Sequence, residues 1–175
     1  MTDEERKVSE LGINLGVLLL RNGKSFLKNN LKTDPRNPIT KANFSTWISE
    51  NIFKGNSLWD EKFYFEGIDF WNTIKRIWWG TKKDDPYTTD THDCEDFAGA
   101  FKSEMSRIFG LNSVGRASGN VYKNGKLLER HSFNIIVADG MKSLLFEPMD
   151  GTMIEWTGQK TVLGNWAYEI DWIEF

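Results

Sequence analysis

The spacing of hydrophobic residues changes near residue 110 of this 175-residue chain. Before that point apolar residues recur every three or four positions, which is typical of helices that bury one face. After it they alternate with polar residues in short runs separated by turn signals such as Asn124-Gly125, which is typical of half-buried strands. The pattern predicts an α+β fold in which N-terminal helices pack against a C-terminal antiparallel β-sheet. The strands outside the central hairpin are expected around residues 114–122, 152–156 and 168–175.

Three helices are expected in the first 80 residues. The first covers residues 8–19, although several glycines weaken its helical preference. The second begins at Asn37 with Pro38 in its first turn, because asparagine caps helices and proline fits the first helical position. The third covers residues 67–79 and ends at Gly80.

The best-marked helix opens at Cys94, which is the only cysteine in the chain. Asp93 is a suitable N-cap, and Gly110 fits the position just past the end of the helix. Unpaired backbone N–H groups and the helix dipole favour a thiolate at this end, whereas neighbouring carboxylates oppose it, so a cationic histidine is needed to activate the thiol. One apolar stripe contains the cysteine and directs it into the protein: Cys94, Phe97, Ala98, Phe101, Met105 and Ile108.

A hairpin is expected to bring His131 and Glu147 together. His131 starts a strand that ends at the turn signal Asp139-Gly140, and Glu147 ends the returning strand. A two-residue turn would put Pro148 opposite His131, whereas a three-residue turn puts Glu147 diagonally near His131. We therefore predict a three-residue turn, a bulge, or a strand that ends before Glu147. With a two-residue turn, Asp150 becomes the stronger candidate to orient the imidazole.

Cys94, His131 and Glu147 give, in chain order, a thiol, an imidazole and a carboxylate, the set in which a base activates a nucleophile and a third group orients the base. The local sequences and their order resemble the transglutaminase-like cysteine peptidase superfamily, and its bacterial and phage-encoded members most closely, over roughly residues 70–150. The sequences that carry the resemblance are Asp93-Cys94-Glu95-Asp96-Phe97-Ala98, His131-Ser132-Phe133-Asn134 and Phe146-Glu147-Pro148.

The resemblance implies a papain-like or transglutaminase-like core with the nucleophile at a helix N-terminus. On this interpretation residues 1–175 form a single domain. Residues 1–66 would be its helical N-terminal part, and residues 67–175 its catalytic-type core.

The expected function is that of a cysteine-dependent amide-bond hydrolase or acyl transferase, a thiol protease that acts on a peptide or protein substrate without a cofactor. Two alternatives remain open: a catalytically inactive transglutaminase-like binding module for peptide or glycan, and a papain-like peptidoglycan hydrolase. Three departures from the family pattern keep the alternatives open. Glu147 stands where aspartate is usual, Phe133 stands where tryptophan is common, and residues 89–92 replace a glycine-rich approach to the cysteine.

A second group of candidates surrounds the cysteine. Trp79 and Tyr87 lie upstream of Cys94, where the resemblance implies aromatic contributions to substrate or oxyanion contacts. His92 is expected to line the cleft or to cap the helix, and Asp96 to hydrogen-bond within the fold close to the site. No metal is expected, because a zinc site needs ligands that converge from at least two segments and the chain has no second cysteine.

Charge and composition exclude few classes of protein. The net charge of −3, from 22 Lys and Arg against 25 Asp and Glu, gives no general attraction to nucleic acid. A lone cysteine forms no intrachain disulfide and suits a reducing compartment. The first residues do not resemble a signal peptide, and the apolar run at residues 11–20 is too short to span a bilayer. We therefore expect a cytoplasmic protein, phage-encoded or bacterial by resemblance, that binds no membrane; its oligomeric state leaves no trace in the sequence.

Overall fold

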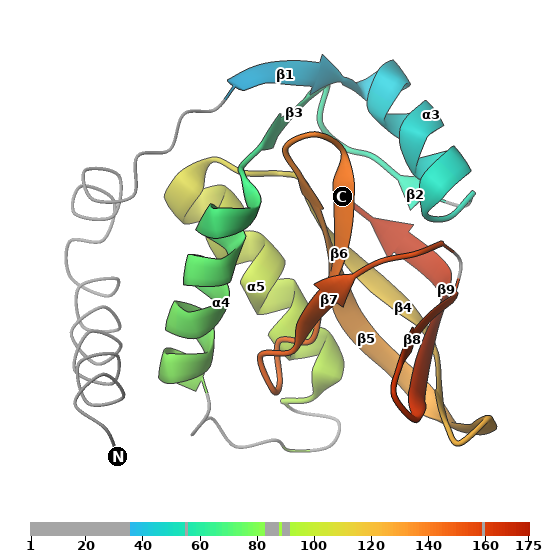
Figure 1. Cartoon of the computed structure of the whole chain (residues 1–175). Coiled ribbons are helices and arrows are strands. Elements are labelled where there is room, and N and C mark those ends of the chain that lie inside the picture. Colours follow the sequence, from blue (N-terminus) through green and yellow to red (C-terminus); the bar gives the residue numbers. More distant parts are fainter. Residues whose placement is uncertain (1–35, 55, 83–87, 89–91, 159) are drawn as a thin grey trace.

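The computed structural model describes residues 36–54, 56–82, 88, 92–158 and 160–175 (Figure 1). The helix expected over residues 8–19 and the candidate Tyr87 lie outside the described residues. The elements follow one another as β1 (Arg36–Thr40), α3 (Lys41–Asn51), β2 (Asn56–Ser57), β3 (Lys62–Phe65), α4 (Ile68–Lys82), α5 (Cys94–Phe109), β4 (Val114–Lys123), β5 (Lys126–Ala138), β6 (Lys142–Phe146), β7 (Met153–Glu155), β8 (Lys160–Leu163) and β9 (Trp166–Glu174).

A seven-stranded sheet forms the centre of the molecule, with the strand order β2-β9-β4-β5-β6-β7 and β8 paired to β9. All of its neighbouring strands are antiparallel except β2 and β9, which run parallel. The strands β1 and β3 form a separate two-stranded sheet. In Figure 1, α4 and α5 lie together on one side of the large sheet, while α3 and the β1–β3 pair lie towards its other side.

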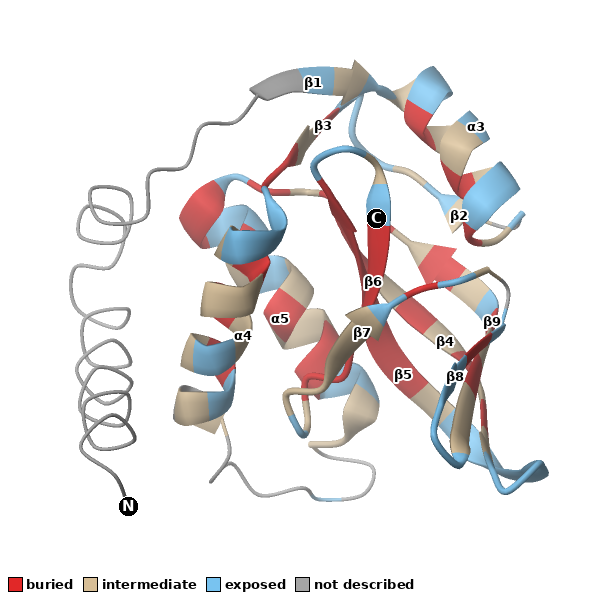
Figure 2. Ribbon diagram, viewed as in Figure 1, coloured by how far each residue is buried: buried red, intermediate tan, exposed pale blue. Residues whose placement is uncertain are grey.

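The long strand β5 is buried on both faces from Ser132 to Ala138, because a hydrophobic cluster covers each face (Figure 2). Phe133, Ile135 and Val137 point into one cluster with residues of α3, β3 and β9. The alternate residues Ile136 and Ala138 join a second cluster formed with α4 and α5. Since successive side chains of a strand face opposite ways, a fully buried strand reads as a continuous apolar run.

Aromatic rings join α4 and α5 to the sheet. The ring of Trp78 on α4 meets the edge of Phe101 on α5 with centroids 5.0 Å apart, and Phe101 lies 4.5 Å from Phe146 on β6. Gly110 ends α5 in a left-handed conformation at φ 70°, which glycine adopts without the penalty that a Cβ imposes. The predicted boundaries of this helix, Cys94 and Gly110, are therefore confirmed.

The expected fold class is wrong. Strands occupy more of the described residues than helices do, and the segment from 36 to 66, expected to be helical, contains one helix and three strands. Strand β2 has only two residues and pairs with β9 from the far end of the chain. The helices do not precede the sheet as a separate packed layer, because α3 lies between strands in the sequence. The division into parts at residue 66 stays a prediction.

Two predicted helix boundaries also differ from the structure. Asn37 and Pro38 lie in β1, and α3 begins after Thr40, because pairing of β1 with β3 takes this segment into a strand. The pairing is irregular around Pro38, as expected for a residue that has no N–H to donate. Helix α4 continues through Gly80 to Lys82, whose ammonium lies 5.5 Å from the ring centroid of Trp78. A single glycine weakens a helix without ending it.

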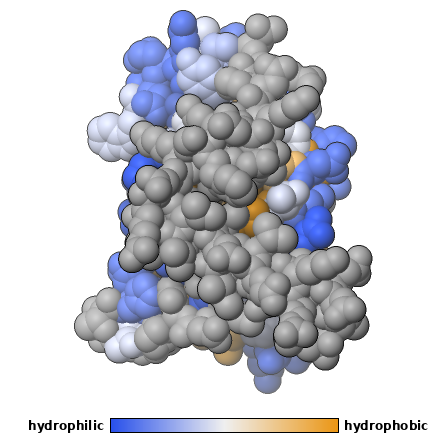
Figure 3. Space-filling model, turned by 90° about the vertical axis from the view of Figure 1, so that its left-hand side faces the viewer, coloured by the Kyte–Doolittle hydropathy of each residue, from blue (hydrophilic) through white to orange (hydrophobic). Residues whose placement is uncertain are grey.

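The described surface combines polar residues with a few exposed apolar side chains. Figure 3 shows mainly hydrophilic described residues at the margins of the side it presents, with small hydrophobic areas between them. Large exposed apolar side chains are found chiefly at Trp59, Leu127, Leu128 and Val162. Among the helices of the described part, none is long and apolar enough to cross a membrane.

We expect Gly119→Ala to destabilise the protein strongly, because a Cβ at this position would lie 1.8 Å from the backbone oxygen of Glu169 in the paired strand β9. The pairing of β4 with β9 shifts at this point, and the backbones cannot separate without breaking the ladder. We expect a loss of about 2–4 kcal/mol in the free energy of unfolding. Gly99→Ala in α5 is the matched control, since nothing lies within 4 Å of its added Cβ. Equal stabilities of the two variants in chemical denaturation would contradict the close approach.

Candidate functional site

The start of α5 is held by a capping box. The Asp93 side chain accepts a hydrogen bond from the backbone N–H of Glu95 at 3.3 Å, and the backbone N–H of Asp93 donates to Asp96 at 3.2 Å. These bonds satisfy amide groups that a helix leaves unpaired at its first turn. They place the half-buried free thiol of Cys94 at the first position of the helix. Asp96 thus bonds within the fold at the edge of the site.

The hairpin of β5 and β6 has a three-residue turn, as predicted. Ala138 pairs with Lys142, which leaves Asp139, Gly140 and Met141 in the turn. Asn134 pairs with Phe146, where β6 ends, so the next residue, Glu147, lies diagonally near His131. The prediction that His131 starts its strand is wrong. Strand β5 begins at Lys126, and its first part pairs with β4 before β6 joins on the other side at Asn134.

His131 and Glu147 form a short, buried hydrogen bond. The distance from His131 Nε2 to Glu147 Oε2 is 2.6 Å, and the two side chains are only 13% and 6% exposed. The other carboxylate oxygen of Glu147 accepts a hydrogen bond from the backbone N–H of Met149 at 3.2 Å. Glu147 is thus fixed by partners on both oxygens, which orients the imidazole in turn.

The thiol of Cys94 also contacts the His131 ring, so the structure brings the three predicted residues together. Burial lowers the pKa of His131, but hydrogen bonds and charge interactions with Cys94 and Glu147 outweigh it and raise the pKa from 6.5 to about 10. His131 is therefore a cation at neutral pH. The catalytic roles that the resemblance assigns to Cys94, His131 and Glu147 stay a prediction.

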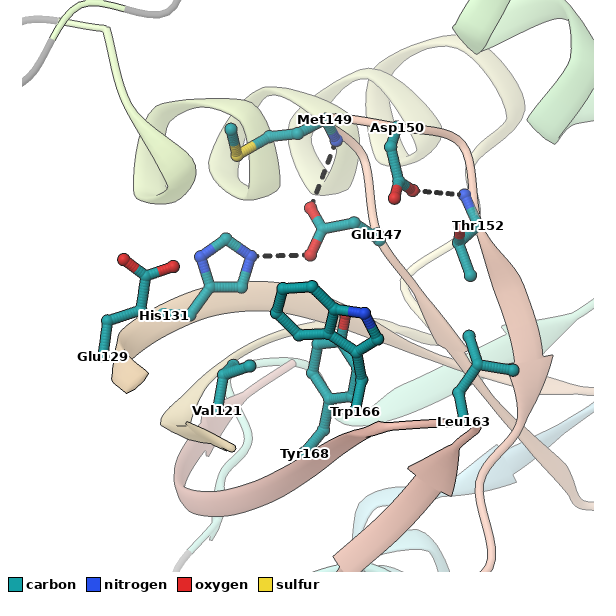
Figure 4. A pocket seen from close by; sticks show the side chains of 10 residues that line it. All are labelled: Val121, Glu129, His131, Glu147, Met149, Asp150, Thr152, Leu163, Trp166 and Tyr168. Carbon is teal, nitrogen blue, oxygen red and sulfur yellow. Dashed lines mark hydrogen bonds and ion pairs between the residues drawn. The ribbon is translucent and has the colours of Figure 1, made fainter. Parts of the chain in front are cut away.

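A pocket of about 460 Å³ opens beside the His131–Glu147 pair (Figure 4). Its volume lies within the range of small-molecule sites, roughly 300–1,000 Å³. In Figure 4 the rings of Trp166 and Tyr168 lie below the pair, Glu129 lies on the side of His131, and Asp150 lies on the side of Glu147. The residues that line it are Val121, Glu129, His131, Glu147, Met149, Asp150, Thr152, Leu163, Trp166 and Tyr168.

Tyr168 is a buried phenol that lines the pocket together with Glu147 and Asp150. Burial raises the pKa of the Tyr168 phenol, and the negative charges of Glu147 and Asp150 raise it further. The ring itself is held edge-on against Phe133, with centroids 5.4 Å apart. Tyr168 consequently keeps its proton and remains a hydrogen-bond donor throughout the neutral range.

Helix α4 supports the segment that carries Glu147 and Asp150. The indole N–H of Trp78 donates to the backbone oxygen of Pro148 at 3.0 Å. Gly151, at φ 75°, lies so close to Trp79 that a Cβ there would be 3.1 Å from the Trp79 side chain. The candidate Trp79 thus packs against this loop and does not line the pocket. Asp150 accepts a hydrogen bond from the N–H of Thr152 at 2.7 Å and lines the pocket without bonding His131.

The remaining candidate, His92, does not line the pocket; its ring lies 4.5 Å from that of Phe97. No group of acidic, histidine or cysteine side chains in the described part of the chain is arranged to hold a metal ion. The aromatic side of the pocket, formed by Trp166 and Tyr168, was not predicted from the sequence. The available signal was the pair Gly164-Asn165, a turn signal flanked by alternating residues, which marks the β8–β9 hairpin.

Comparison with solved structures finds the fold of this chain in Polyporus squamosus lectin. A PSL1a–E64 complex matches with a TM-score of 0.57 and 19% identity over 79% of this chain and 50% of that chain. The lectin bound to the human-type influenza-binding epitope Neu5Aca2-6Galb1-4GlcNAc matches with a TM-score of 0.57 and 17% identity over 79% of this chain and 49% of the lectin. This chain thus spans about half the length of the proteins it matches. No protein-family model and no curated protein sequence matches it.

These findings correct the family indicated by the sequence. The structures that share the fold are those of a lectin, so the expected membership in the transglutaminase-like peptidase superfamily is wrong. The prediction of an enzyme, a thiol protease or acyl transferase, rested on that membership and loses its support with it. The physical reason is that the three short sequences determine only local geometry: a helix start, a strand and the end of a hairpin. Such local geometry does not identify a family, because unrelated folds reproduce the same constellations.

We expect His131 of the folded protein to titrate near pH 10, and its pKa to fall in Glu147→Gln, where the partner carboxylate is lost. Nuclear magnetic resonance of the ring nitrogens measures this directly, and His92→Asn assigns the signals because the chain has two histidines. The pKa of His131 in the folded protein exceeds the unfolded value of 6.5. The stabilisation of the fold by the charged imidazole is therefore complete below pH 6.5 and is lost as pH rises through 10. The free energy of unfolding should therefore decline over this interval in the wild type and decline less in Glu147→Gln. A folded-state pKa near 6.5 would contradict the geometry.

Proposed function

We propose that this chain is a glycan-binding module and that the pocket beside His131 and Glu147 is its site. The observation that carries the proposal is the combination, around one pocket, of two aromatic rings and three carboxylates. Sugars present hydroxyl groups around a ring whose faces carry C–H groups. A site for them needs flat apolar surfaces for the C–H faces and fixed acceptors for the hydroxyls.

Trp166 and Tyr168 supply the flat surfaces. Both come from β9, on alternate positions that face the same way. Tryptophan and tyrosine offer large rigid areas with a polar tip, which suits a ligand that is apolar on its faces and polar at its edges. The ammonium of Lys123 lies 4.7 Å from the ring centroid of Trp166 but Lys123 does not line the pocket.

The carboxylates supply the acceptors. An ionised carboxylate has two oxygens and accepts several hydrogen bonds, so it can receive two neighbouring hydroxyls of one sugar. Glu147 is fixed by His131 and by the N–H of Met149, and Asp150 is fixed by the N–H of Thr152. Acceptors that are already oriented reduce the entropy lost on binding.

The likeness to Polyporus squamosus lectin supports the ligand class by analogy of fold. The epitope bound in one of those structures is that protein's ligand, and this chain aligns with about half of that protein. The proposal therefore adopts the class, a glycan, and not the particular epitope. Of the ligands considered for a binding module, peptide and glycan, the glycan agrees with both the pocket and the comparison.

We expect Trp166→Ala to weaken binding of N-acetylchitotriose about five- to tenfold in isothermal titration calorimetry, because the largest flat surface of the pocket is removed. Trp59→Ala is the matched control, since Trp59 is 75% exposed and lies outside the pocket. The Galb1-4GlcNAc disaccharide serves as a second ligand. Absence of binding for every saccharide tested, or equal losses in the two variants, would overturn the proposal.

A further inference from the structure

The charges around the pocket are unevenly distributed. Glu147 is paired with the His131 cation, and this pair is close to neutral. Glu129 and Asp150, both exposed, line the pocket as well. Within the described part of the chain, no cation lies within ion-pair distance of either carboxylate. Two negative charges at the pocket are therefore uncompensated.

Two basic side chains of the β4–β5 hairpin are engaged elsewhere. Lys123 lies over the ring of Trp166 outside the pocket lining, and Arg130 is engaged by Asp171 in a bidentate ion pair with distances of 2.6 and 3.0 Å. Burial is the main cause of the raised pKa of the Tyr168 phenol, and the charge of Asp150 adds to it after that of Glu147. The field at the pocket thus favours a cation and opposes an anion.

In Figure 4 the two uncompensated carboxylates lie on either side of the His131–Glu147 pair, with the aromatic rings below it. A ligand that carries positive charge at more than one point along a flat, hydroxylated chain matches this arrangement. We propose that the pocket selects cationic amino sugars, such as oligomers of glucosamine, over neutral and acidic glycans. This inference rests on the proposed function, because it names the ligand class of the same site.

N-acetylation provides a matched ligand pair for the test. The trimer of glucosamine carries an ammonium on each sugar, whereas N-acetylchitotriose has the same ring skeleton without those charges. We expect the glucosamine trimer to bind the full chain about fivefold more tightly at pH 6 and 20 mM salt, and the preference to fall below about twofold at 500 mM salt. An α2-6-sialylated trisaccharide, which is anionic, should bind more weakly than either.

Asp150→Asn and Glu129→Gln should each reduce the preference for the glucosamine trimer by about twofold, since each removes one charge and keeps the side-chain shape. In Asp150→Asn the amide oxygen of the new side chain can still accept the hydrogen bond from the N–H of Thr152. Glu155→Gln is the control, because this exposed carboxylate on β7 lies outside the pocket.

The outcomes separate this inference from the proposed function. Equal binding of the charged and acetylated trimers, or tighter binding of the sialylated one, would overturn the charge preference and leave glycan binding in place. An undiminished, roughly fivefold preference in both Asp150→Asn and Glu129→Gln would also overturn it. If none of the three trisaccharides binds, the proposed function fails and the inference fails with it.

Discussion

The buried amide of Asn134 joins the helical and sheet layers on which the rest of the structure depends. Its Nδ2 donates to the backbone oxygen of Ala98 in α5 at 2.9 Å and to that of Gly115 in β4 at 3.2 Å, and the residue is fully buried. A buried donor left without these partners would be costly, so the bonds hold α5 in one position against β5. Its two neighbours in the strand, Phe133 and Ile135, face the other layer. One strand thereby positions both the thiol helix and the pocket.

The turn of the β5–β6 hairpin determines what His131 meets. Three residues in the turn place Glu147 on the same face as Phe133 and diagonal to His131, whereas a shift by one residue would turn Glu147 to the opposite face. The position of Glu147 relative to His131 could be predicted from the sequence, because it depends only on the pairing of two adjacent strands and on the number of residues in the turn. The start of α5 could be predicted because it too is local: the cap residue, Asp93, directly precedes Cys94 in the sequence.

Elements that depend on distant pairing could not be predicted. Strand β2 has two residues and exists because it pairs with Ile173 and Glu174 at the end of the chain. Strand β1 replaces a predicted helix start because β3 is available as a partner. The aromatic side of the pocket arises in the same way, since β4 pairs with both β5 and β9 and so holds the strand of Trp166 and Tyr168 one strand away from that of His131. Local sequence indicated the thiol, imidazole and carboxylate, and suggested a family that the fold does not support.

The pocket combines a rigid base with walls that come from separate elements of the fold. The base is the His131–Glu147 bond, fixed between two buried strands. One wall is the loop at Asp150, which the indole of Trp78 holds through a hydrogen bond. The other wall carries Trp166 on the β8–β9 hairpin. A hydrogen bond from the backbone N–H of Asn124 to the backbone oxygen of Asn165 joins this hairpin to the β4–β5 turn. Because these walls pack through different contacts, a substitution at Asp150 can alter charge without moving the aromatic rings. The carboxylate of Asp150 and the ring of Trp166 are thus held in place by separate contacts.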